Sequence, residues 1–551
     1  MPSLLTTPVD DQLQRLTLDQ KLGQLLHPFL RPGESQADWD RHLGDVQPGG
    51  VFIFPGTREE MARATDYVQK RSSIPVVIAS DLENGAGRMI SDATVFPDLM
   101  AVAAADDEEL AYTMGEAAAR EGREAGIHWT FAPVIDINAN PQNPITNTRS
   151  LGDVPARILR LASALVRGMQ DHGLAATIKH FPGDGYDCRD QHVCTTINPL
   201  SMEQWRRLSG RLFRELVEQG VWSVMPGHIA LPAWDPGNHD DISAAPPATL
   251  SRRLLTDLLR GELGFDGLIV SDASFMGGVT SWGGRDVVVP GMINAGNDQV
   301  LFCEPRIDFD ALKRAVEQEV VPMQRIDEAV RRVLQFKHLL GLFGPPRESD
   351  VSPADRDRYR HASEEIARKA ITLVTDRLGA LPTGIRPGSK VLSYHLRGDA
   401  IYNVDGMDDL LRGAGAEVVR RTEEHLWGLP SREEMATFDA ILVHVVYGPS
   451  WNTNRIRLAG NFLRDVVLSL SFDDPRLVFI SYGTPYVQLD LPRIPCLLNA
   501  YSPDPTTQRA VLDILLGKAA AQGTSPVDLG FPDRWFLAAH REQPFDQSQG
   551  G

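Results

Sequence analysis

Short apolar runs alternate with longer amphipathic stretches through roughly the first 340 residues. Runs this short do not by themselves separate a buried strand from a buried helix, but β-branched residues and flanking Gly or Pro favour strands here. We expect strands at 50–54, 76–80, 129–132, 176–180, 223–225, 268–271 and 300–302, with helices at 58–71, 108–125, 155–172, 202–219 and 251–262. Seven β-then-α units predict an α/β fold, namely an N-terminal (β/α)8 TIM-type barrel with one irregular unit. An open doubly wound sheet is the alternative.

The alternation breaks around residues 343–348 and then resumes in a second series. A long helix is expected over 355–375, followed by strands at 390–394, 417–419, 440–446, 477–481 and 496–500. Five strands with helical crossovers predict a smaller open parallel sheet in an α/β/α sandwich, flavodoxin-like in shape. We therefore expect a catalytic barrel over 1–348 and a second domain over 349–551, which includes the connecting helix and ends in a polar tail.

Composition and charge narrow the possible partners and location. The chain has 551 residues, of which 42% are hydrophobic and 23% charged, as in ordinary globular proteins. A formal net charge of -18 argues against nucleic acid or an anionic membrane as the main partner, since both require a basic face. The start of the sequence lacks a secretory signal and no run is apolar enough to span a membrane, so a cytoplasmic location is expected. The four cysteines are expected to be reduced.

Ionisable side chains follow several of the predicted strands directly. Asp81 comes after the second strand, Lys179 and His180 close the fourth, His228 follows the fifth and Asp272 follows the sixth. The carboxyl ends of parallel strands meet on one face of a barrel, where active sites lie. These side chains therefore predict a common site, although they are far apart in the sequence.

The segment after the fourth strand is the richest in candidate chemistry. Asp190 and His192 are separated by one residue, so in an extended segment both side chains share a face. A carboxylate beside an imidazole fixes the ring tautomer and favours the protonated ring, which suits a general acid. A surface contact or a capping network is the alternative for this pair.

A metal site is an alternative interpretation of the same segment. Candidate nitrogen and oxygen ligands are His180, Asp184, Asp187, Asp190 and His192. The spacings typical of zinc sites are absent here, and Lys179 would repel a cation. We therefore expect neither a metal ion nor a cofactor at the site.

Four segments together resemble one family. Residues 179–185, Lys-His-Phe-Pro-Gly-Asp-Gly, followed by Asp190-Gln191-His192, resemble the signature of the β-N-acetylglucosaminidases of glycoside hydrolase family 3. Residues 81–88, 147–152 and 264–272 are similar to three further stretches of that family, in the same order. The sequence departs from the pattern at Arg88, which comes two residues later than usual after Glu83. It also carries Asp184 where the bacterial cell-wall recycling enzymes have His, and Ala273 in place of a second Asp.

This resemblance implies a two-domain, retaining glycosidase acting on terminal β-linked N-acetylglucosamine. Asp272 would be the nucleophile and His192 the acid/base, assisted by Asp190 on a loop that moves between open and closed forms. The substrate would be a small oligosaccharide or amino-sugar glycoside, such as a muropeptide fragment or a chitin oligosaccharide. The residues expected to bind the sugar are Asp81, Arg88, Arg149, Lys179, His180 and His228.

Several alternatives stay open at this point. Within the family the chain could be a β-glucosidase or an N-acetylglucosaminide phosphorylase. Outside it, the alternatives are a non-catalytic sugar-binding protein and a metal-dependent barrel hydrolase. The second domain is expected to stabilise the barrel or an oligomer such as a homodimer. Its residues His444, Tyr447 and Trp451 either reach the mouth of the barrel or pack in a strand-to-helix turn, and packing is the favoured interpretation.

Overall fold

The computed structural model describes residues 7–237, 244–344, 351–398, 403–422, 432–451, 456–458 and 470–530. The chain divides into two compact units. The first consists of Met1–Lys369 and Pro449–Arg455, and the second of Ala370–Gly448 and Ile456–Gly551. The expected domain boundary at 348 and 349 and the polar tail lie outside the described residues. No helix within the described ranges is long and apolar enough to cross a membrane.

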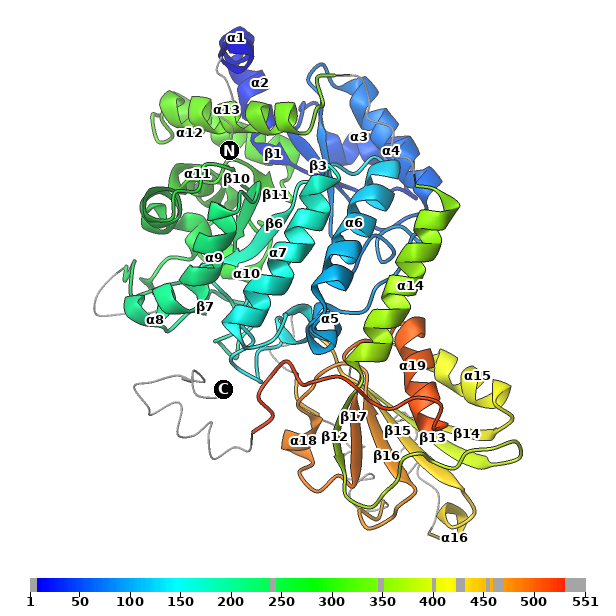
Figure 1. Ribbon diagram of the computed structural model, residues 1–551. Helices are drawn as coiled ribbons and strands as arrows, with labels where there is room; N and C mark the ends of the chain where they lie inside the picture. Colours follow the sequence, from blue (N-terminus) through cyan, green and yellow to red (C-terminus); the bar gives the residue numbers. More distant parts are fainter. Residues whose placement is uncertain are drawn as a thin grey trace. The chain divides into compact units, whose positions relative to one another are not determined.

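Parallel strands form the centre of the first unit (Figure 1). The strands are β1 (Leu26–His27), β2 (Phe29–Leu30), β3 (Gly50–Ile53), β4 (Val77–Ser80), β5 (Trp129–Thr130), β6 (Thr177–Phe181), β8 (Ser223–Pro226), β10 (Leu268–Ile269) and β11 (Val300–Leu301). Parallel pairing joins β2-β3-β4-β5, β6-β8-β10 and β1-β11. Single parallel bridges from Trp129 to Ala175 and from Val270 to Gln299 connect these sheets to one another.

The first strand of this unit is not among the strands predicted from the sequence. It is broken into β1 and β2 by Pro28, which has no N–H to donate to a neighbouring strand. Its carbonyl still accepts the N–H of Phe52 at 2.9 Å, so the chain stays beside β3 through the break. Two dipeptides on either side of a proline, one of them containing a histidine, are too short to stand out as a strand pattern.

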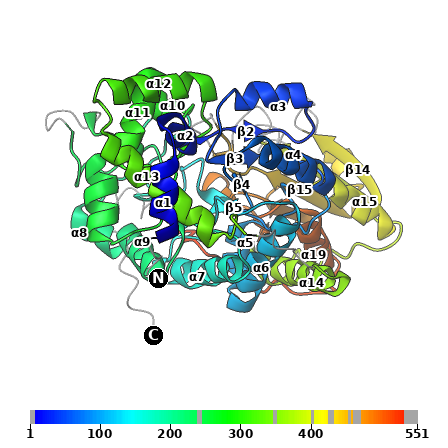
Figure 2. The same cartoon turned by 90° about the horizontal axis from the view of Figure 1, so that it is seen from above.

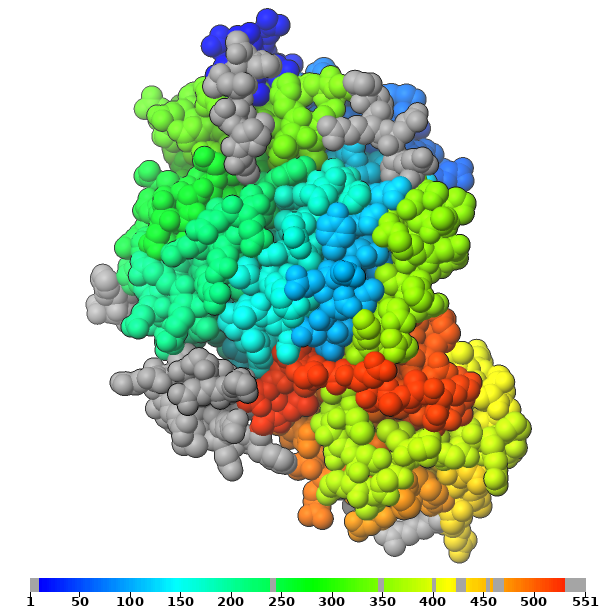
Figure 3. Space-filling view, viewed as in Figure 1, coloured from blue at the N-terminus to red at the C-terminus, as the bar shows by residue number. Residues whose placement is uncertain are grey.

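Helices surround these strands, as the view from above shows (Figure 2). They are α1 (Thr7–Arg15), α2 (Leu18–Gln24), α3 (Gln36–Leu43), α4 (Arg58–Arg71), α5 (Leu99–Ala105), α6 (Glu108–Glu124), α7 (Pro155–Asp171), α8 (Met202–Arg207), α9 (Ser209–Glu218), α10 (Gly277–Thr280), α11 (Arg285–Ala295), α12 (Pro305–Glu317), α13 (Met323–Leu339) and α14 (Pro353–Ala370). Helices α6 and α7 form part of the outer surface in Figure 3. Short strands β7 (Thr196–Ile197) and β9 (Ile229–Ala230) pair outside the main sheets.

Two expected helices differ in the structure. The helix expected over 202–219 is divided into α8 and α9, because the backbone at Leu208 leaves the helical region. The helix expected over 251–262 is a π-helix, Arg253–Glu262, and a 3-10 turn, Ala248–Leu250, precedes it.

The second unit contains a six-stranded sheet in the order β12-β17-β16-β15-β13-β14. Its strands are β12 (Thr372–Asp376), β13 (Lys390–Arg397), β14 (Glu417–Thr422), β15 (Ala440–Val446), β16 (Leu477–Ser481) and β17 (Cys496–Asn499). Its helices are α15 (Asp405–Gly413), α16 (Arg432–Met435), α18 (Val487–Asp490) and α19 (Pro505–Leu515). The five strands from β13 to β17 are parallel and follow the flavodoxin-like order. Apolar side chains form a buried core on each face of the sheet.

The expectation of an all-parallel sheet was wrong at one edge. The helix expected over 355–375 ends at Ala370, and the next residues form β12, which pairs with β17 in the antiparallel sense. The segment Ile371-Thr372-Leu373-Val374-Thr375 is rich in β-branched residues, which fit a strand better than a helix end.

Candidate active site

Asp272 follows β10 at the level where the parallel strands end. One of its carboxylate oxygens accepts the N–H of Ala273 at 2.7 Å, and the other lies 3.9 Å from Nε2 of His180. Burial opposes ionisation, but three imidazoles and the Ala273 N–H outweigh it and hold the pKa of Asp272 below its ordinary value. The three imidazoles are those of His180, His228 and His192. The carboxylate of Asp272 is therefore ionised at neutral pH.

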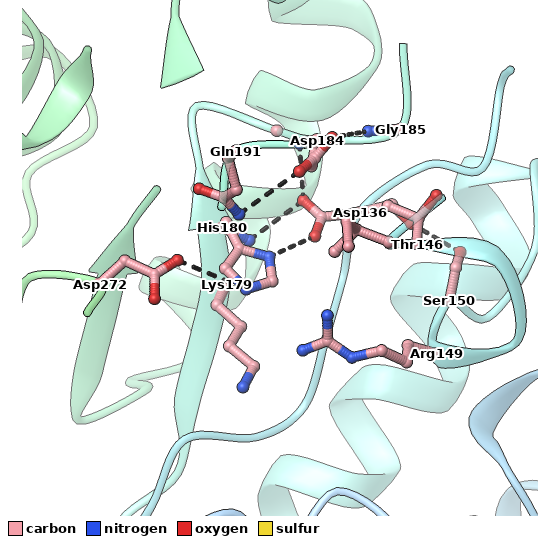
Figure 4. A network of polar contacts seen from close by, with 12 residues as sticks. Asp136, Thr146, Arg149, Ser150, Lys179, His180, Asp184, Gly185, Gln191 and Asp272 are labelled. Carbon is pink, nitrogen blue, oxygen red and sulfur yellow. Dashed lines mark hydrogen bonds and ion pairs between the residues drawn. The ribbon is translucent and has the colours of Figure 1, made fainter. Parts of the chain in front are cut away.

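A buried carboxylate fixes the orientation of His180. Asp136 accepts the backbone N–H of His180 at 3.0 Å, and its second oxygen lies 2.7 Å from Nδ1 (Figure 4). Because a carboxylate can only accept, Nδ1 carries the proton, and Nε2 is the atom that faces Asp272. Asp136 was not predicted. Its sequence signal is a single acidic residue in the apolar stretch Val134-Ile135-Asp136-Ile137.

Asp184 lies beside this pair and is fully enclosed by protein groups. It accepts hydrogen bonds from Asn143 Nδ2 at 2.9 Å and from the Gly185 N–H at 2.6 Å. Burial, followed by the nearby charge of Asp136, raises the pKa of Asp184 to about 6. This side chain changes charge close to neutral pH, while the carboxylate of Asp272 does not.

Two cations are held in place by Glu83. Arg149 donates to both oxygens of Glu83, at 3.0 and 2.8 Å, and Lys179 Nζ lies 2.6 Å from the same carboxylate. Although burial opposes it, these two cations hold the pKa of Glu83 far below its ordinary value. Lys179 Nζ also lies 3.4 Å from Asp81, whose side chain is 42% exposed. In Figure 4, Asp272 and Arg149 lie on opposite sides of the Lys179 side chain.

Asp190 and His192 form the predicted contact, but residues 191–193 make a turn and not the extended segment that was expected. Nδ1 of His192 lies 2.7 Å from Oδ1 of Asp190, and the same oxygen accepts the backbone N–H of His192 at 2.7 Å. The Asp190 side chain is fully buried, whereas the imidazole of His192 is partly exposed. Nδ1 therefore carries the proton, and Nε2 is the ring nitrogen that does not face Asp190.

The segment carrying this pair is attached to the chain that follows Asp272. The N–H of Gly277 donates to the His192 carbonyl at 2.8 Å, and the N–H of Gly278 donates to the Gln191 carbonyl at 3.1 Å. A side chain at position 278 would have its Cβ 2.6 Å from that carbonyl oxygen, so only glycine permits this approach. The two candidate catalytic groups are thereby held on backbone segments that contact each other.

His228 supports the backbone beside Asp272 instead of facing outward. Its Nε2 lies 3.0 Å from the Ala273 carbonyl and its Nδ1 lies 2.8 Å from the Thr249 hydroxyl. Burial lowers the pKa of His228 below its ordinary value, so the ring is neutral at neutral pH. We expected a sugar contact here. Because both ring nitrogens already have protein partners, a hydrogen bond from His228 to a sugar would have to break one of them.

Arg88 also has a protein partner. Its guanidinium donates to Asp98, whose carboxylate accepts the side-chain N–H of Asn84 at 2.8 Å as well. Asn84 belongs to the four residues that separate Glu83 from Arg88 in this chain. Arg88, which comes two residues later than in the family pattern, is therefore held by an ion pair with Asp98, ten residues further along the chain.

An aromatic side chain reaches the site from a distant part of the sequence. Trp451 belongs to the first unit, and the preceding N–H, of Ser450, donates to the Pro144 carbonyl at 3.2 Å. The centroid of its ring lies 5.3 Å from that of His192 and 4.9 Å from Cζ of Arg149. The indole is 37% exposed, so it keeps a free face next to both side chains.

The favoured packing interpretation was therefore wrong for Trp451. It holds for His444 and Tyr447, which are buried in the core of the second unit. No local pattern distinguishes the three, because His444 lies in β15 and the other two follow it within five residues.

Comparisons with known proteins agree with this geometry. The family described as "Glycosyl hydrolase family 3 N terminal domain" matches residues 17–336. A β-N-acetylglucosaminidase/β-glucosidase of Cellulomonas fimi is 34% identical over 539 residues, which is 94% of each chain. A β-hexosaminidase of Thiobacillus denitrificans is 30% identical over 57% of this chain and 93% of its own.

Solved structures give the same result for both units. A β-glucoside phosphorylase superposes with a TM-score of 0.85 and 33% identity, covering 96% of this chain and 98% of its own. A family 3 β-N-acetylglucosaminidase from Paenibacillus superposes with a TM-score of 0.78 and 29% identity, covering 93% and 99%. The chain therefore belongs to glycoside hydrolase family 3 and is a glycosidase.

Proposed function

We propose that the chain removes terminal β-linked N-acetylglucosamine with retention of configuration, using Asp272 as nucleophile and His192 as acid/base. The observation that carries this proposal is the Asp190–His192 contact, attached by backbone hydrogen bonds to the segment of Asp272. Relatives named β-hexosaminidase and β-N-acetylglucosaminidase support the same choice of sugar.

Asp272 suits the attacking role because it is ionised and only slightly exposed. In the first step one of its oxygens forms a bond to the anomeric carbon while the glycosidic bond breaks. The surrounding imidazoles keep the carboxylate charged, and that charge stabilises the positive charge developing on the sugar ring.

His192 suits the proton-transfer role because Asp190 occupies its Nδ1. Nε2 gives a proton to the leaving oxygen as the glycosidic bond breaks, and the buried carboxylate stabilises the imidazolium that precedes this transfer. In the second step the neutral ring takes a proton from water, which attacks the glycosyl-enzyme and releases Asp272.

Sugar recognition is assigned to the side chains that have donors and acceptors near Asp272. Glu83 holds Arg149 and Lys179 at fixed positions, so their remaining N–H groups are preorganised for hydroxyl or acetamide oxygens. Asp81 is exposed enough to accept hydrogen bonds from ring hydroxyls. His180 completes the group, whereas His228 is assigned to holding the backbone next to Asp272.

The leaving-group side is assigned to Trp451. A general acid stands beside the oxygen that departs, so a ring in contact with His192 borders the aglycone. The exposed face of an indole offers apolar surface for the flat face of a second sugar.

We also propose that the first unit is a closed (β/α)8 barrel. The support comes from the parallel pairings together with the bridges at Ala175 and Gln299, which link β2 through β11 in sequence order. The N–H of Gly49, the residue before β3, donates to the Leu26 carbonyl of β1 at 3.1 Å. This hydrogen bond joins β1 to β3 and so supports a closed ring of strands.

Trapping the intermediate tests the proposed chemistry. A 2-fluoro or 5-fluoro glycosyl fluoride should form a stable adduct, and peptide mapping should find the label on Asp272. Label on another residue would overturn the mechanism. Comparing nitrophenyl glycosides of N-acetylglucosamine and glucose tests the sugar, and a clear preference for glucose would make the chain a β-glucosidase.

Phosphorolysis is a second candidate function. It is favoured by the similarity to a β-glucoside phosphorylase along nearly the whole of both chains. A histidine at the acid/base position repels an approaching phosphate less than a glutamate would. Adding inorganic phosphate and measuring sugar 1-phosphate decides between the acceptors, because hydrolysis alone yields only free sugar.

A further inference from the structure

A group of buried polar side chains lies inside the second unit, apart from the residues assigned to catalysis. His395 on β13 and His444 on β15 are direct partners in the parallel register, so both side chains project from the same face of the sheet. Their ring centroids are 4.9 Å apart. Asp408, on α15, covers this face, and all three side chains are at most 1% exposed.

Two of these side chains already contact each other. Nε2 of His395 lies 3.1 Å from Oδ1 of Asp408. The Ser393 hydroxyl lies 3.0 Å from the same nitrogen and 2.6 Å from the same carboxylate oxygen. One nitrogen and one oxygen that can bind a metal ion, with a hydroxyl beside both, therefore meet at one point.

The third side chain, His444, contacts the rings of His395 and Tyr482 but makes no hydrogen bond within the described part of the chain. Both ring nitrogens of His444 are buried and lack a hydrogen bond to any of the described residues. One of these nitrogens lies within 4.8 Å of the ligand atoms of His395 and Asp408. Burying an imidazole without a hydrogen bond destabilises the folded chain, so the position of His444 indicates a ligand that satisfies it.

The place of this group in the sheet is one where ligands bind in related folds. The crossovers from β13 and from β15 run in opposite directions, which makes the space between these two strands the topological switch point. His395 and His444 both lie in the carboxyl-terminal halves of their strands.

We propose that His395, Asp408 and His444 bind one Zn²⁺ ion that stabilises the second unit. Two imidazoles and one carboxylate are a ligand set that zinc commonly uses, and four-coordinate zinc has bonds of about 2.0–2.2 Å to such atoms. The 3.1 Å between Nε2 of His395 and Oδ1 of Asp408 already suits two ligand atoms of one zinc ion. Only the His444 ring, whose nitrogen lies within 4.8 Å of both atoms, has to move inward. The Ser393 hydroxyl or a water molecule supplies the fourth ligand.

One cation stands close to this group. Nη1 of Arg420 lies 3.7 Å from Oδ2 of Asp408, which is the oxygen that does not contact His395. Arg420 also pairs with Asp405, so its charge is shared between two carboxylates. Oδ1 of Asp408 is therefore the oxygen directed at the zinc, and removing the Arg420 charge should strengthen metal binding.

Metal analysis of the full chain tests the proposal. The chain is produced with zinc in the medium, freed of any affinity tag and analysed by mass spectrometry and zinc X-ray absorption. We expect one zinc per chain with imidazole and oxygen ligands and no sulfur. In His444→Phe the zinc should be lost, while His361→Phe, at an exposed position on α14, serves as the matched control and should retain it. Ser393→Ala should weaken zinc retention by about 10- to 100-fold.

Each result either supports the site or overturns it. A metal-free chain that also takes up no Co²⁺ on refolding would overturn the proposal and leave a buried water molecule as the partner of His444. Zinc retained in His444→Phe, or zinc bound through sulfur, would place the metal elsewhere and overturn it as well. If His444→Phe does not fold, the ligand types in the X-ray absorption of the unaltered chain give the answer.

Discussion

Adding one methyl group at Gly278 should separate the acid/base from the nucleophile without altering either. The Cβ of an alanine there would lie 2.6 Å from the Gln191 carbonyl oxygen and 2.7 Å from Cβ of His228. Ordinary contacts begin at 3.4 Å, so the segment bearing His192 has to retreat by about 0.8 Å. The hydrogen bond from the Gly278 N–H to the Gln191 carbonyl is stretched by the same movement.

The size of the effect follows from this displacement. A shift of about 1 Å in a catalytic group costs roughly 10²-fold in rate, so kcat/KM should fall by about that factor. The loss should depend on the leaving group, because only poor leaving groups need a proton from His192. The folded state should be weakened by about 1–3 kcal/mol, the range for overfilled sites.

The assay compares two substrates of one sugar. For Gly278→Ala we expect kcat/KM to fall about 100-fold with an N-acetylglucosamine disaccharide and only a few-fold with the 2,4-dinitrophenyl glycoside. Gly261→Ala is the matched control, because this exposed helical position has room for a Cβ, with its nearest neighbour 3.4 Å away. Circular dichroism confirms that both variants are folded.

Two outcomes would refute the reasoning. Unchanged activity of Gly278→Ala on the disaccharide would mean that the contact between the two segments does not position His192. An equal loss with both substrates would mean that the methyl group acts on Asp272 or on sugar binding, since departure of dinitrophenol requires no acid.

Three further predictions address the same site. Asp190→Asn should lower kcat/KM for a disaccharide by about 10²–10⁴-fold with little change for a dinitrophenyl glycoside, because the buried amide no longer stabilises the His192 imidazolium; equal effects on both substrates would contradict this. Trp451→Ala should raise KM for a disaccharide by up to about 10-fold with kcat nearly constant, and Trp451→Phe should have a KM close to that of the unaltered chain. An unchanged KM in Trp451→Ala would show that the ring does not contact the aglycone. Asp184 has a folded-state pKa of about 6, above its unfolded value, so its contribution to stability is complete below about pH 4 and is lost as pH rises through 6. Between pH 4 and 7, the free energy of unfolding of Asp184→Asn, measured with urea, should rise relative to that of the unaltered chain by on the order of 3 kcal/mol. A difference that stays constant with pH would show that this carboxyl titrates normally.

Much of the site could be predicted because its members stand next to strands. Asp272, Lys179, His180 and Asp81 each follow or end a buried apolar run, and parallel strands bring such positions together whatever their separation in the chain. The Asp190–His192 contact was predicted, but the extended segment on which that prediction relied is a turn, in which Oδ1 of Asp190 accepts the backbone N–H of His192.

The features that were missed depend on contacts that leave no local pattern. The first strand is broken by Pro28, so neither half reaches the length of a recognisable strand. Asp136 is one acidic residue among apolar neighbours, and its partners follow more than forty residues later. Gly278 matters for the absence of a side chain, which sequence periodicity does not register. Nothing near Trp451 indicates that its ring belongs with Arg149, three hundred residues earlier.

The path of the chain between the two units limits how this enzyme can be dissected or rearranged. Residues 449–455 return to the first unit from within the second, so no single cut releases a complete first unit. A truncation after residue 369 would remove the indole beside His192 even if every strand of the first unit folded. Exchange of everything after residue 369 between homologues would likewise replace this ring, so any aglycone preference that depends on it would come from the donor of the C-terminal half. The chain therefore divides into two compact units, but the residues proposed to determine specificity do not divide at the same point in the sequence.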